Sequence, residues 1–278
     1  MNRYKNLEDI TFVSFDLETT GLFPITCKII EIGAIKFNLS GEIARFETLV
    51  NPNAPISIES YNVHQIDYDM IKDKPSIEEV LPDFINFIDD CVVIAHNSIF
   101  DVSFISYCLM KQNSPFPDNI VLDTRLLAKN LVKDSPNYKL KTLTEYFGFE
   151  GLTYHRAIND AEYCMKVFLE IIKLFNDNTI MLDEVMKYDT PIGFDIITKE
   201  HEKIDIPEYY LWVKDAIINN QKVKITYKKV DGEISEREIT PINLLKLKNK
   251  IYLEAFCHLR GEKRNFKLSK ILKIIYTI

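Results

Sequence analysis

No uninterrupted apolar stretch in this sequence reaches the roughly 18 residues that a membrane-spanning helix requires, so we expect no membrane association. The first residues lack the apolar core of a signal peptide, which predicts a cytoplasmic protein with reduced thiols. The sequence also lacks internal repeats, and no two cysteines have the close spacing of a zinc or redox pair. We therefore expect all five cysteines to be core residues, namely Cys27, Cys91, Cys108, Cys164 and Cys257.

The charge of the chain is unevenly distributed. The formal net charge of the 278 residues is −7, yet residues 207–278 contain 15 Lys and Arg against 8 Asp and Glu. The remaining residues contain 19 Lys and Arg against 33 Asp and Glu. A basic C-terminal segment is compatible with nucleic-acid binding, although lysines on exposed strands also discourage pairing at a sheet edge. The length predicts two domains, and a hydrophobic content of 46% predicts that they are folded.

The N-terminal part has the pattern of an α/β domain. Three β-rich runs separated by turn residues predict a three-stranded meander over residues 12–15, 29–37 and 43–50. The elements expected next are a helix after Pro75, a buried strand over 91–95, a helix containing Val102 to Leu109 and a last helix containing Ala161 to Phe175. This order predicts a mixed sheet with helices packed around it.

The C-terminal part has the pattern of a small β domain. Apolar periodicity weakens after about Asn176, so we expect an N-terminal domain over residues 1–178 and a linker over 179–206. Residues 207–278 then begin with a short helix that ends near Asn219. The expected strands cover residues 223–230, 236–240 and 251–257, with a hairpin turn at Asp231–Gly232.

Carboxylates follow several of the predicted N-terminal elements. Asp16 and Glu18 end the first strand, and residues two apart on a strand point to the same face. Asp101 follows the strand over 91–95, and Asp160 lies near the start of the last helix. Hard divalent ions prefer such oxygen ligands, and two ions about 3.5–4 Å apart activate a water and stabilise the leaving oxygen of a phosphodiester. Acidic residues at strand ends also occur as solvated or capping groups, so the Asp16–Glu18 pair alone does not establish a site; together with Asp101 and Asp160, the pattern is compatible with metal-dependent phosphodiester chemistry.

Three motifs carry a family resemblance, and they are listed here in chain order: Ser14-Phe-Asp-Leu-Glu-Thr-Thr-Gly21, Ile94-Ala-His-Asn-Ser-Ile-Phe-Asp101 and Tyr154-His-Arg-Ala-Ile-Asn-Asp160. In this order they resemble the DEDDh 3′→5′ exonucleases, the family of the proofreading epsilon subunits of bacterial DNA polymerase III. The resemblance covers about residues 10–175. It implies a ribonuclease H-like mixed sheet flanked by helices and two Mg²⁺ ions, which Mn²⁺ can replace. It also implies four acidic metal ligands, Asp16, Glu18, Asp101 and Asp160.

The same resemblance implies that His155 is the general base. A neutral imidazole accepts a proton from a water near neutral pH, because the unperturbed pKa of histidine is about 6.5. Five residues separate His155 from Asp160, and on a regular helix this offset would turn the two side chains to different sides. We therefore predict that His155 lies in the loop just before the last helix.

Other residues resemble substrate-contacting positions of the family, and each has a structural alternative. Thr19 either presents its backbone to the terminal nucleotide or shapes the turn, and His64 either packs over that nucleotide or is a surface residue. Asn97 is expected to hydrogen-bond within the framework of the site. We expect Asp123 to cap a helix and His96 to have a structural role.

The C-terminal segment resembles the WYL domain through five motifs, Val223-Lys-Ile-Thr-Tyr227, Arg237-Glu-Ile-Thr-Pro241, Ile251-Tyr-Leu253, Cys257-His-Leu-Arg260 and Arg264-Asn-Phe-Lys-Leu268. The resemblance implies a small SH3-like β-barrel that binds a nucleotide or a single strand through a basic, aromatic-bearing face. The residues expected to bind are Tyr252, Arg260, Arg264 and Lys267; in the alternative, Tyr252 and Phe266 are core residues and the charged residues are only surface. Two departures are that Ile251 replaces the tryptophan of the name-giving triad and that Lys267 replaces an arginine, which removes a bidentate donor.

The sequence thus predicts an enzyme that releases nucleoside monophosphates from 3′ ends. DNA is the first substrate choice, because Val50-Asn-Pro-Asn-Ala-Pro-Ile56 and His64 resemble the DNA-proofreading branch. RNA or short oligonucleotides are the alternative, and a non-catalytic nucleic-acid-binding or sensing protein is an alternative of another class. Proofreading would require a polymerase or repair-complex partner, whereas a stand-alone role in repair or processing would not.

Overall fold

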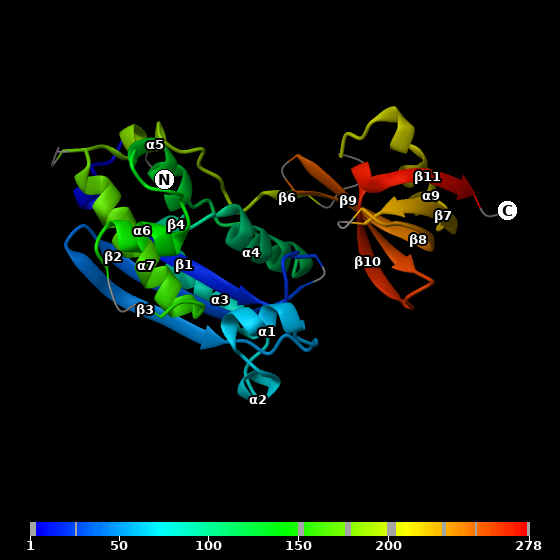
Figure 1. The fold of residues 1–278 in the computed structure, drawn as a ribbon, viewed down its shortest axis with the longest axis horizontal. Helices are drawn as coiled ribbons and strands as arrows, with labels where there is room; N and C mark the ends of the chain where they lie inside the picture. The colour runs from blue at the N-terminus through cyan, green and yellow to red at the C-terminus, as the bar shows by residue number, and fades with distance from the viewer. Residues whose placement is uncertain are drawn as a thin grey trace. The chain divides into compact units, whose positions relative to one another are not determined.

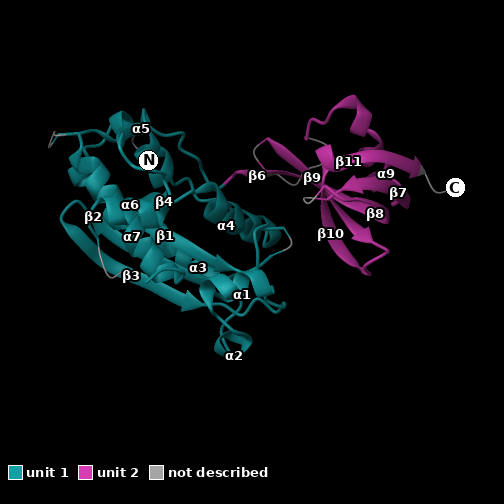
Figure 2. Ribbon diagram, in the orientation of Figure 1, with its two compact units in different colours: residues 1–194 teal, residues 195–278 magenta. Residues whose placement is uncertain are grey.

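The computed structural model describes residues 4–25, 27–149, 153–175, 179–198, 204–229, 232–247 and 249–276. The chain forms two compact units, which comprise residues 1–194 and 195–278 (Figure 2). No helix of the described residues has both the length and the hydrophobicity that crossing a membrane requires.

A five-stranded mixed sheet forms the centre of the first unit (Figure 1). Its strands, in chain order, are β1 (Phe12–Thr19), β2 (Ile29–Asn38), β3 (Gly41–Leu49), β4 (Val92–Ala95) and β5 (Val121–Asp123). The spatial order is β3-β2-β1-β4-β5, with β1, β2 and β3 antiparallel and β4 and β5 parallel to β1. The predicted meander and the mixed sheet are therefore confirmed.

Helices surround this sheet. Their bounds are α1 (Ile58–His64), α2 (Tyr68–Ile71), α3 (Ile77–Ile88), α4 (Ile99–Lys111), α5 (Thr124–Leu131), α6 (Leu140–Tyr146), α7 (Ala157–Lys173) and α8 (Leu182–Met186), with a 3-10 turn η1 at Leu7–Asp9. The longest of them, α7, packs against β1 and β2. Phe168 of α7 lies 5.2 Å from Phe12 of β1 between ring centroids, and Phe12 stacks on Phe37 of β2 at 5.4 Å. These buried rings hold α7 on the sheet.

The segment expected to be a linker, residues 179–206, belongs in large part to the two units. Ile180, Leu182 and Val185 are buried in the core of the first unit. The main chain explains why: the N–H of Leu7 donates to the oxygen of Ile180 at 3.1 Å, and the N–H of Leu182 donates to the oxygen of Lys5 at 3.0 Å. These residues contact the N-terminal segment through an isolated bridge between Asn6 and Met181, and α8 is only five residues long, which is too short to give the sequence a clear helical periodicity.

The second unit is an antiparallel sheet beside a short helix. The elements are β6 (Ile197–Thr198), η2 (Glu208–Tyr210), α9 (Trp212–Ile218), β7 (Val223–Lys228), β8 (Ile234–Leu247), β9 (Lys250–Cys257), β10 (Glu262–Lys267), η3 (Leu268–Lys270) and β11 (Ile271–Tyr276). The strand order is β10-β9-β8-β7-β11, and β6 pairs with β8. No pairing between β10 and β11 closes this sheet in the described residues, so the expected SH3-like barrel is not confirmed. The hairpin turn expected at Asp231–Gly232 lies partly outside the described residues, because Asp231 is not among them.

Candidate active site

Strand β1 carries the first two carboxylates of the site. Asp16 and Glu18 point to the same face, as predicted, because they lie two residues apart. Across the antiparallel pair with β2, Gly33 lies opposite Asp16 and Glu31 lies opposite Glu18. The register of this pair shifts between Glu18 and Thr19, and such an irregularity bends the end of a strand and redirects its side chains.

The third carboxylate, Asp101, lies in the first turn of α4. Strand β4 runs parallel to β1, so α4 begins near the end of both strands. The Asp101 side chain is only 2% exposed, and its Oδ1 accepts a hydrogen bond from the N–H of Leu17 at 3.1 Å. This bond fixes the start of α4 to β1 at Leu17, the residue between Asp16 and Glu18.

Asp160 and His155 lie at the start of α7. Asp160 is buried in the first turn of the helix, whereas His155 precedes the helix and is exposed, so its predicted loop position is confirmed. The His155 backbone is in the left-handed region, with φ 66°. In this conformation its N–H donates to Oδ2 of Asp160 at 2.9 Å. The loop residue and the helix residue are therefore held together.

The four acidic side chains share one strongly negative environment. Glu18, His155 and Asp160 each have one potential metal-ligand atom, and these three atoms lie within 4.8 Å of one another. Burial is the largest cause that raises the pKa of Glu18 to about 8, and Asp160, Glu31 and Asp101 raise it further. Burial likewise raises the pKa of Asp160 to about 6. The pKa values of Asp16 and Asp101 are also well above the ordinary value, first through burial and then through neighbouring carboxylates.

This arrangement has the properties of a cation site. Burial and mutual repulsion make the ionised carboxylates unfavourable, and a bound cation relieves both effects. Oδ1 of Asp160 is buried and has no hydrogen-bond partner among the described residues, although Oδ2 is bonded to the N–H of His155. Oxygen ligands of this kind suit a hard divalent ion.

Thr19 and His64 lie beside this cluster. The Thr19 hydroxyl donates to the oxygen of Gly21 at 2.7 Å, so the side chain does shape the turn after β1. His64 ends α1 and is 3% exposed, so it is not the surface histidine of the alternative prediction. Its Nδ1 accepts a hydrogen bond from the N–H of Ile66 at 2.9 Å. Burial lowers the pKa of His64, although the negative charge of Glu31 acts in the opposite direction. Contact of either residue with substrate remains a prediction.

Asn97, Asp123 and His96 form the framework behind the cluster. The Asp123 carboxylate caps α5 through the N–H of Arg125 at 2.9 Å and also accepts from the N–H of Asn97 at 3.0 Å. Oδ1 of Asn97 accepts from Nη1 of Arg125 at 3.1 Å. His96 bonds to Thr124 through Nδ1, and burial lowers its pKa to about 4. All three residues have the structural contacts that were expected.

Sequence reasoning assigned no role to three residues that shape the site, namely Glu31, Gly33 and Arg156. Glu31 is completely buried and bonded to Arg156, with Nη2 donating to Oε1 at 2.6 Å. A Cβ on Gly33 would lie 2.1 Å from the backbone nitrogen of Ile158, so the missing side chain lets α7 approach β2. The sequence feature that could have indicated Glu31 and Gly33 is the presence of a charged residue and a glycine within the otherwise largely apolar strand over 29–37.

A basic pocket of about 330 Å³ lies in the second unit. Its lining is made of four cationic residues, two aromatic residues and two small polar residues, namely Lys229, Arg237, Arg260, Arg264, Tyr227, Phe266, Ser235 and Asn265. No carboxylate is among these lining residues. Of the predicted binding residues, Arg260 and Arg264 line the pocket, whereas Tyr252 and Lys267 do not. Tyr252 is 8% exposed and lies opposite Lys267 in the β9–β10 pair.

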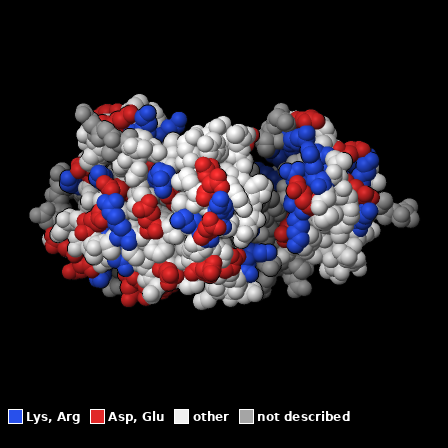
Figure 3. Space-filling view, turned by 90° about the horizontal axis from the view of Figure 1, so that it is seen from below, with Lys and Arg blue, Asp and Glu red and all other residues white. Residues whose placement is uncertain are grey.

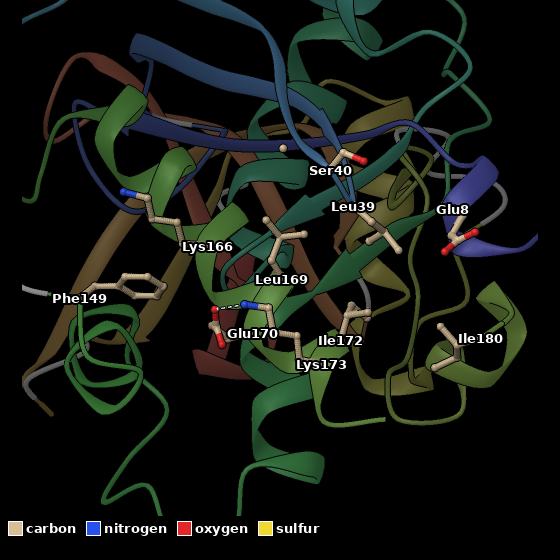
Figure 4. A pocket seen from close by; sticks show the side chains of 11 residues that line it. Glu8, Leu39, Ser40, Phe149, Lys166, Leu169, Glu170, Ile172, Lys173 and Ile180 are labelled. Atoms are coloured by element: carbon tan, nitrogen blue, oxygen red, sulfur yellow. Dashed lines mark hydrogen bonds and ion pairs between the residues drawn. The ribbon is translucent and has the colours of Figure 1, made fainter. Parts of the chain in front are cut away.

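The surface charge differs between the two units. Figure 3 shows acidic and basic side chains interspersed over the first unit, and on the visible face of the second unit it shows a group of basic side chains with acidic ones among them. A hollow of about 570 Å³ on the first unit lies along the outer face of α7 (Figure 4). It is lined by apolar residues such as Leu39, Leu169 and Ile172, and its Lys173 is paired with Glu170. None of the predicted catalytic residues lines this hollow.

Two family models match the chain, the exonuclease model over residues 13–168 and the WYL domain model over residues 208–275. Among curated relatives, the chain is 39% identical over 211 residues to the PolC-type DNA polymerase III of Caldanaerobacter subterraneus subsp. tengcongensis. It is 34% identical over 217 residues to the PolC-type DNA polymerase III of Thermotoga maritima. Each match covers 76% of this chain but only 14% and 16% of the two relatives, so the chain corresponds to a small part of their length.

Solved structures share the fold of the first unit. Exonuclease X in complex with 5′ overhanging duplex DNA matches with a TM-score of 0.50 and 23% identity, covering 63% of this chain and 98% of that chain. The nuclease domain of 3′hExo, described as a DEDDh family member bound to rAMP, matches with a TM-score of 0.52 and 14% identity. That match covers 62% of this chain and 94% of the other. The chain therefore belongs to the exonuclease family through its first unit and carries a WYL domain in its second.

Proposed function

We propose that this protein is a metal-dependent 3′→5′ exonuclease that releases nucleoside monophosphates from DNA. The observation that carries the proposal is the convergence of Asp16, Glu18, Asp101 and Asp160 from β1, α4 and α7, with the exposed His155 at the same place. Glu18, Asp101 and Asp160 are buried and Asp16 is half-buried, and such a group of carboxylates destabilises a metal-free protein. Its presence is best explained by chemistry that needs the negative charge.

The four carboxylates would hold two divalent ions, Mg²⁺ or Mn²⁺. The unpartnered Oδ1 of Asp160 and the raised pKa values of its neighbours fit an oxygen-ligated cation. When bound, such ions supply Lewis-acid activation of a water and offset charge on the phosphate and the leaving oxygen.

The proton-transfer role falls to His155. It is exposed, unlike the carboxylates, and its main chain is fixed to Asp160. From this place the imidazole accepts the proton of the attacking water and later releases it to solvent. Thr19, His64 and Asn97 lie on the elements around the cluster and would position the 3′-terminal nucleotide.

DNA is the preferred substrate in this proposal because the sequence relatives are DNA polymerases. The fold alone does not choose, since its structural neighbours include an exonuclease bound to DNA and another that recognises a histone mRNA stem-loop. The polymerase relatives also support a polymerase or repair-complex partner. A stand-alone function in repair or processing is the second candidate.

Labelled single- and double-stranded DNA and RNA, incubated with Mg²⁺ or Mn²⁺, test the proposal. We expect stepwise shortening from the 3′ end, with nucleoside 5′-monophosphates as products and no shortening in EDTA. His155→Ala should lower kcat by about 10²–10⁴-fold, the usual contribution of a general base. His201→Ala is the control, because nothing in the sequence links that histidine to the nuclease motifs. A wild-type protein that shortens none of the four substrates would refute the proposed exonuclease activity.

For the second unit, we propose that its basic pocket binds a nucleotide or a single-stranded nucleic acid. Arg237 and Arg260 have no ion pair among the described residues, and Arg264 has only a 3.7 Å contact with Glu262. These guanidinium groups suit phosphate oxygens. Of the two aromatic residues in the lining, Phe266 is 4% exposed and packs edge to face against Tyr227 at 5.2 Å, so only the half-buried Tyr227 would offer ring surface to a base. Lys229 is already paired with Glu233 and would contribute less.

Binding of a fluorescent single-stranded oligonucleotide and of a labelled nucleoside monophosphate tests the pocket. The double variant Arg237→Gln/Arg264→Gln should weaken binding by about tenfold or more and reduce the salt dependence, because each lost phosphate contact lowers the slope by about one. Lys263→Gln/Lys273→Gln removes the same charge from exposed positions outside the pocket and should have a small effect. Equal losses in the two double variants would argue against the pocket.

A further inference from the structure

A fifth carboxylate, Glu31, lies against the candidate active site and has no place in the chemistry described above. It is on β2, directly opposite Glu18, and its side chain is completely buried. Its charge raises the pKa values of Asp16, Glu18 and Asp160. A buried charge that opposes three neighbours is costly unless another interaction requires it.

That interaction is with Arg156 and Ala157. The Arg156 guanidinium donates to both oxygens of Glu31, from Nη2 to Oε1 at 2.6 Å and from Nε to Oε1 at 3.0 Å and to Oε2 at 3.2 Å. The N–H of Ala157 also donates to Oε2, at 2.9 Å. Glu31 thereby holds one side chain and one backbone group of the two residues that directly follow His155. A two-point guanidinium pair of this kind fixes orientation as well as distance.

The conformation of His155 depends on this anchor. A left-handed backbone is unfavourable for a residue other than glycine, and it persists only where the surroundings enforce it. Here the N–H of His155 bonds to Asp160, and the N–H of Asp160 in turn donates to the oxygen of Arg156 at 3.0 Å. Residue 156 is thus bonded to β2 by its side chain and to Asp160 by its carbonyl.

We propose that Glu31 and Arg156 are positioning residues that hold His155 and Asp160 in their reactive arrangement. The inference deepens the proposed function and rests on it. A second arginine provides the contrast, since Arg45 of β3 also bridges to α7, donating to Glu162 at 2.8 Å and to Glu42 of its own strand. Both arginines tie the sheet to α7, but only Arg156 adjoins His155.

Three variants test the proposal: Arg156→Lys, the double variant Glu31→Gln/Arg156→Gln and the control Arg45→Gln. The double variant removes both charges together, so no buried charge is left unpaired and the fold is retained. We expect its kcat to fall about 100-fold, the effect of misplacing a reacting group by about 1 Å, with KM within about twofold of wild type. Arg156→Lys keeps the positive charge but loses the forked guanidinium, so its kcat should lie between those of the wild type and the double variant. Arg45→Gln should keep wild-type kcat.

Hydrogen exchange at the His155 amide gives a readout that does not need activity. The wild-type N–H should be protected by its bond to Asp160, and the double variant should lose about tenfold or more of this protection, while Arg45→Gln retains it. An inactive wild type would refute the exonuclease, and the amide exchange alone would then decide the positioning role. A double variant with wild-type kcat and wild-type protection at His155 would overturn the inference.

Discussion

Replacing Asp101 with asparagine is expected to lower kcat by about 10³-fold while making the metal-free protein more stable. The loss of activity follows because the asparagine amide cannot supply the charge that holds a divalent ion and offsets the developing charge. The gain in stability follows because Asp101 is 2% exposed and its pKa is raised by burial and by Asp123 and Asp160. Asparagine keeps the acceptor that Leu17 requires, so the link between β1 and α4 survives.

The gain in stability from Asp101→Asn in the metal-free protein should be larger at high pH than at low pH. The pKa of Glu18 is raised from 4.5 to about 8 and that of Asp160 from 3.8 to about 6, so the metal-free folded protein holds protons that the unfolded chain would release. This contribution to stability is complete below about pH 4 and is lost as the pH rises through 6 and 8. In EDTA the wild-type melting temperature should therefore fall between pH 5 and pH 8.5, and Asp101→Asn should reduce the fall.

Thermal unfolding in EDTA and in Mn²⁺ measures both effects. Saturating metal should raise the wild-type melting temperature most at the high end of the pH range, and it should raise that of Asp101→Asn much less. Asp83→Asn, the same substitution at an exposed position of α3, should change neither activity nor the response to metal. An Asp101→Asn protein that is less stable than wild type without metal would contradict the account of the carboxylate cluster.

The features that local sequence could predict are those whose cause is local. Asp16 and Glu18 lie at the end of a clear strand, and Asp101 and Asp160 each lie within a few residues of a predicted element. The position of His155 followed from its five-residue offset to Asp160. In each case the periodicity of one element determines which way the side chain points.

The features that the sequence did not predict depend on partners far along the chain. Glu31 and Arg156 are separated by 125 residues, and a charged residue within an apolar strand does not identify its counter-ion. Residues 180–182 fold back on residues 5–7, so a segment without periodicity becomes part of the core. Strand β10 has mostly charged and polar residues with only Phe266 buried, and such a strand has no apolar run to indicate it.

Gly33→Ala is expected to be among the most disruptive single substitutions in the first unit. The added Cβ would lie 2.1 Å from the nitrogen of Ile158 and 2.2 Å from the carbonyl carbon of Ala157. These are backbone atoms in the first turn of α7, so the helix has to move away from β2 because no side chain can rotate aside. Inserting one carbon into such a contact costs about 1–3 kcal/mol of unfolding free energy, and the two-residue spacing from Glu31 places the Arg156 pair under strain as well.

The same shift should remove most of the activity, since α7 carries Asp160 and is preceded by His155. Denaturant unfolding and steady-state kinetics should show a lower midpoint and a kcat reduced by about 100-fold. Gly21→Ala is the matched comparison, because the Cβ there would meet only the Cys27 side chain, with Sγ at 2.7 Å, and that side chain is able to rotate. A Gly33→Ala protein with the wild-type midpoint and kcat would mean that α7 does not need its close approach to β2. The arrangement of His155 and Asp160 would then have to depend on the Glu31–Arg156 pair alone.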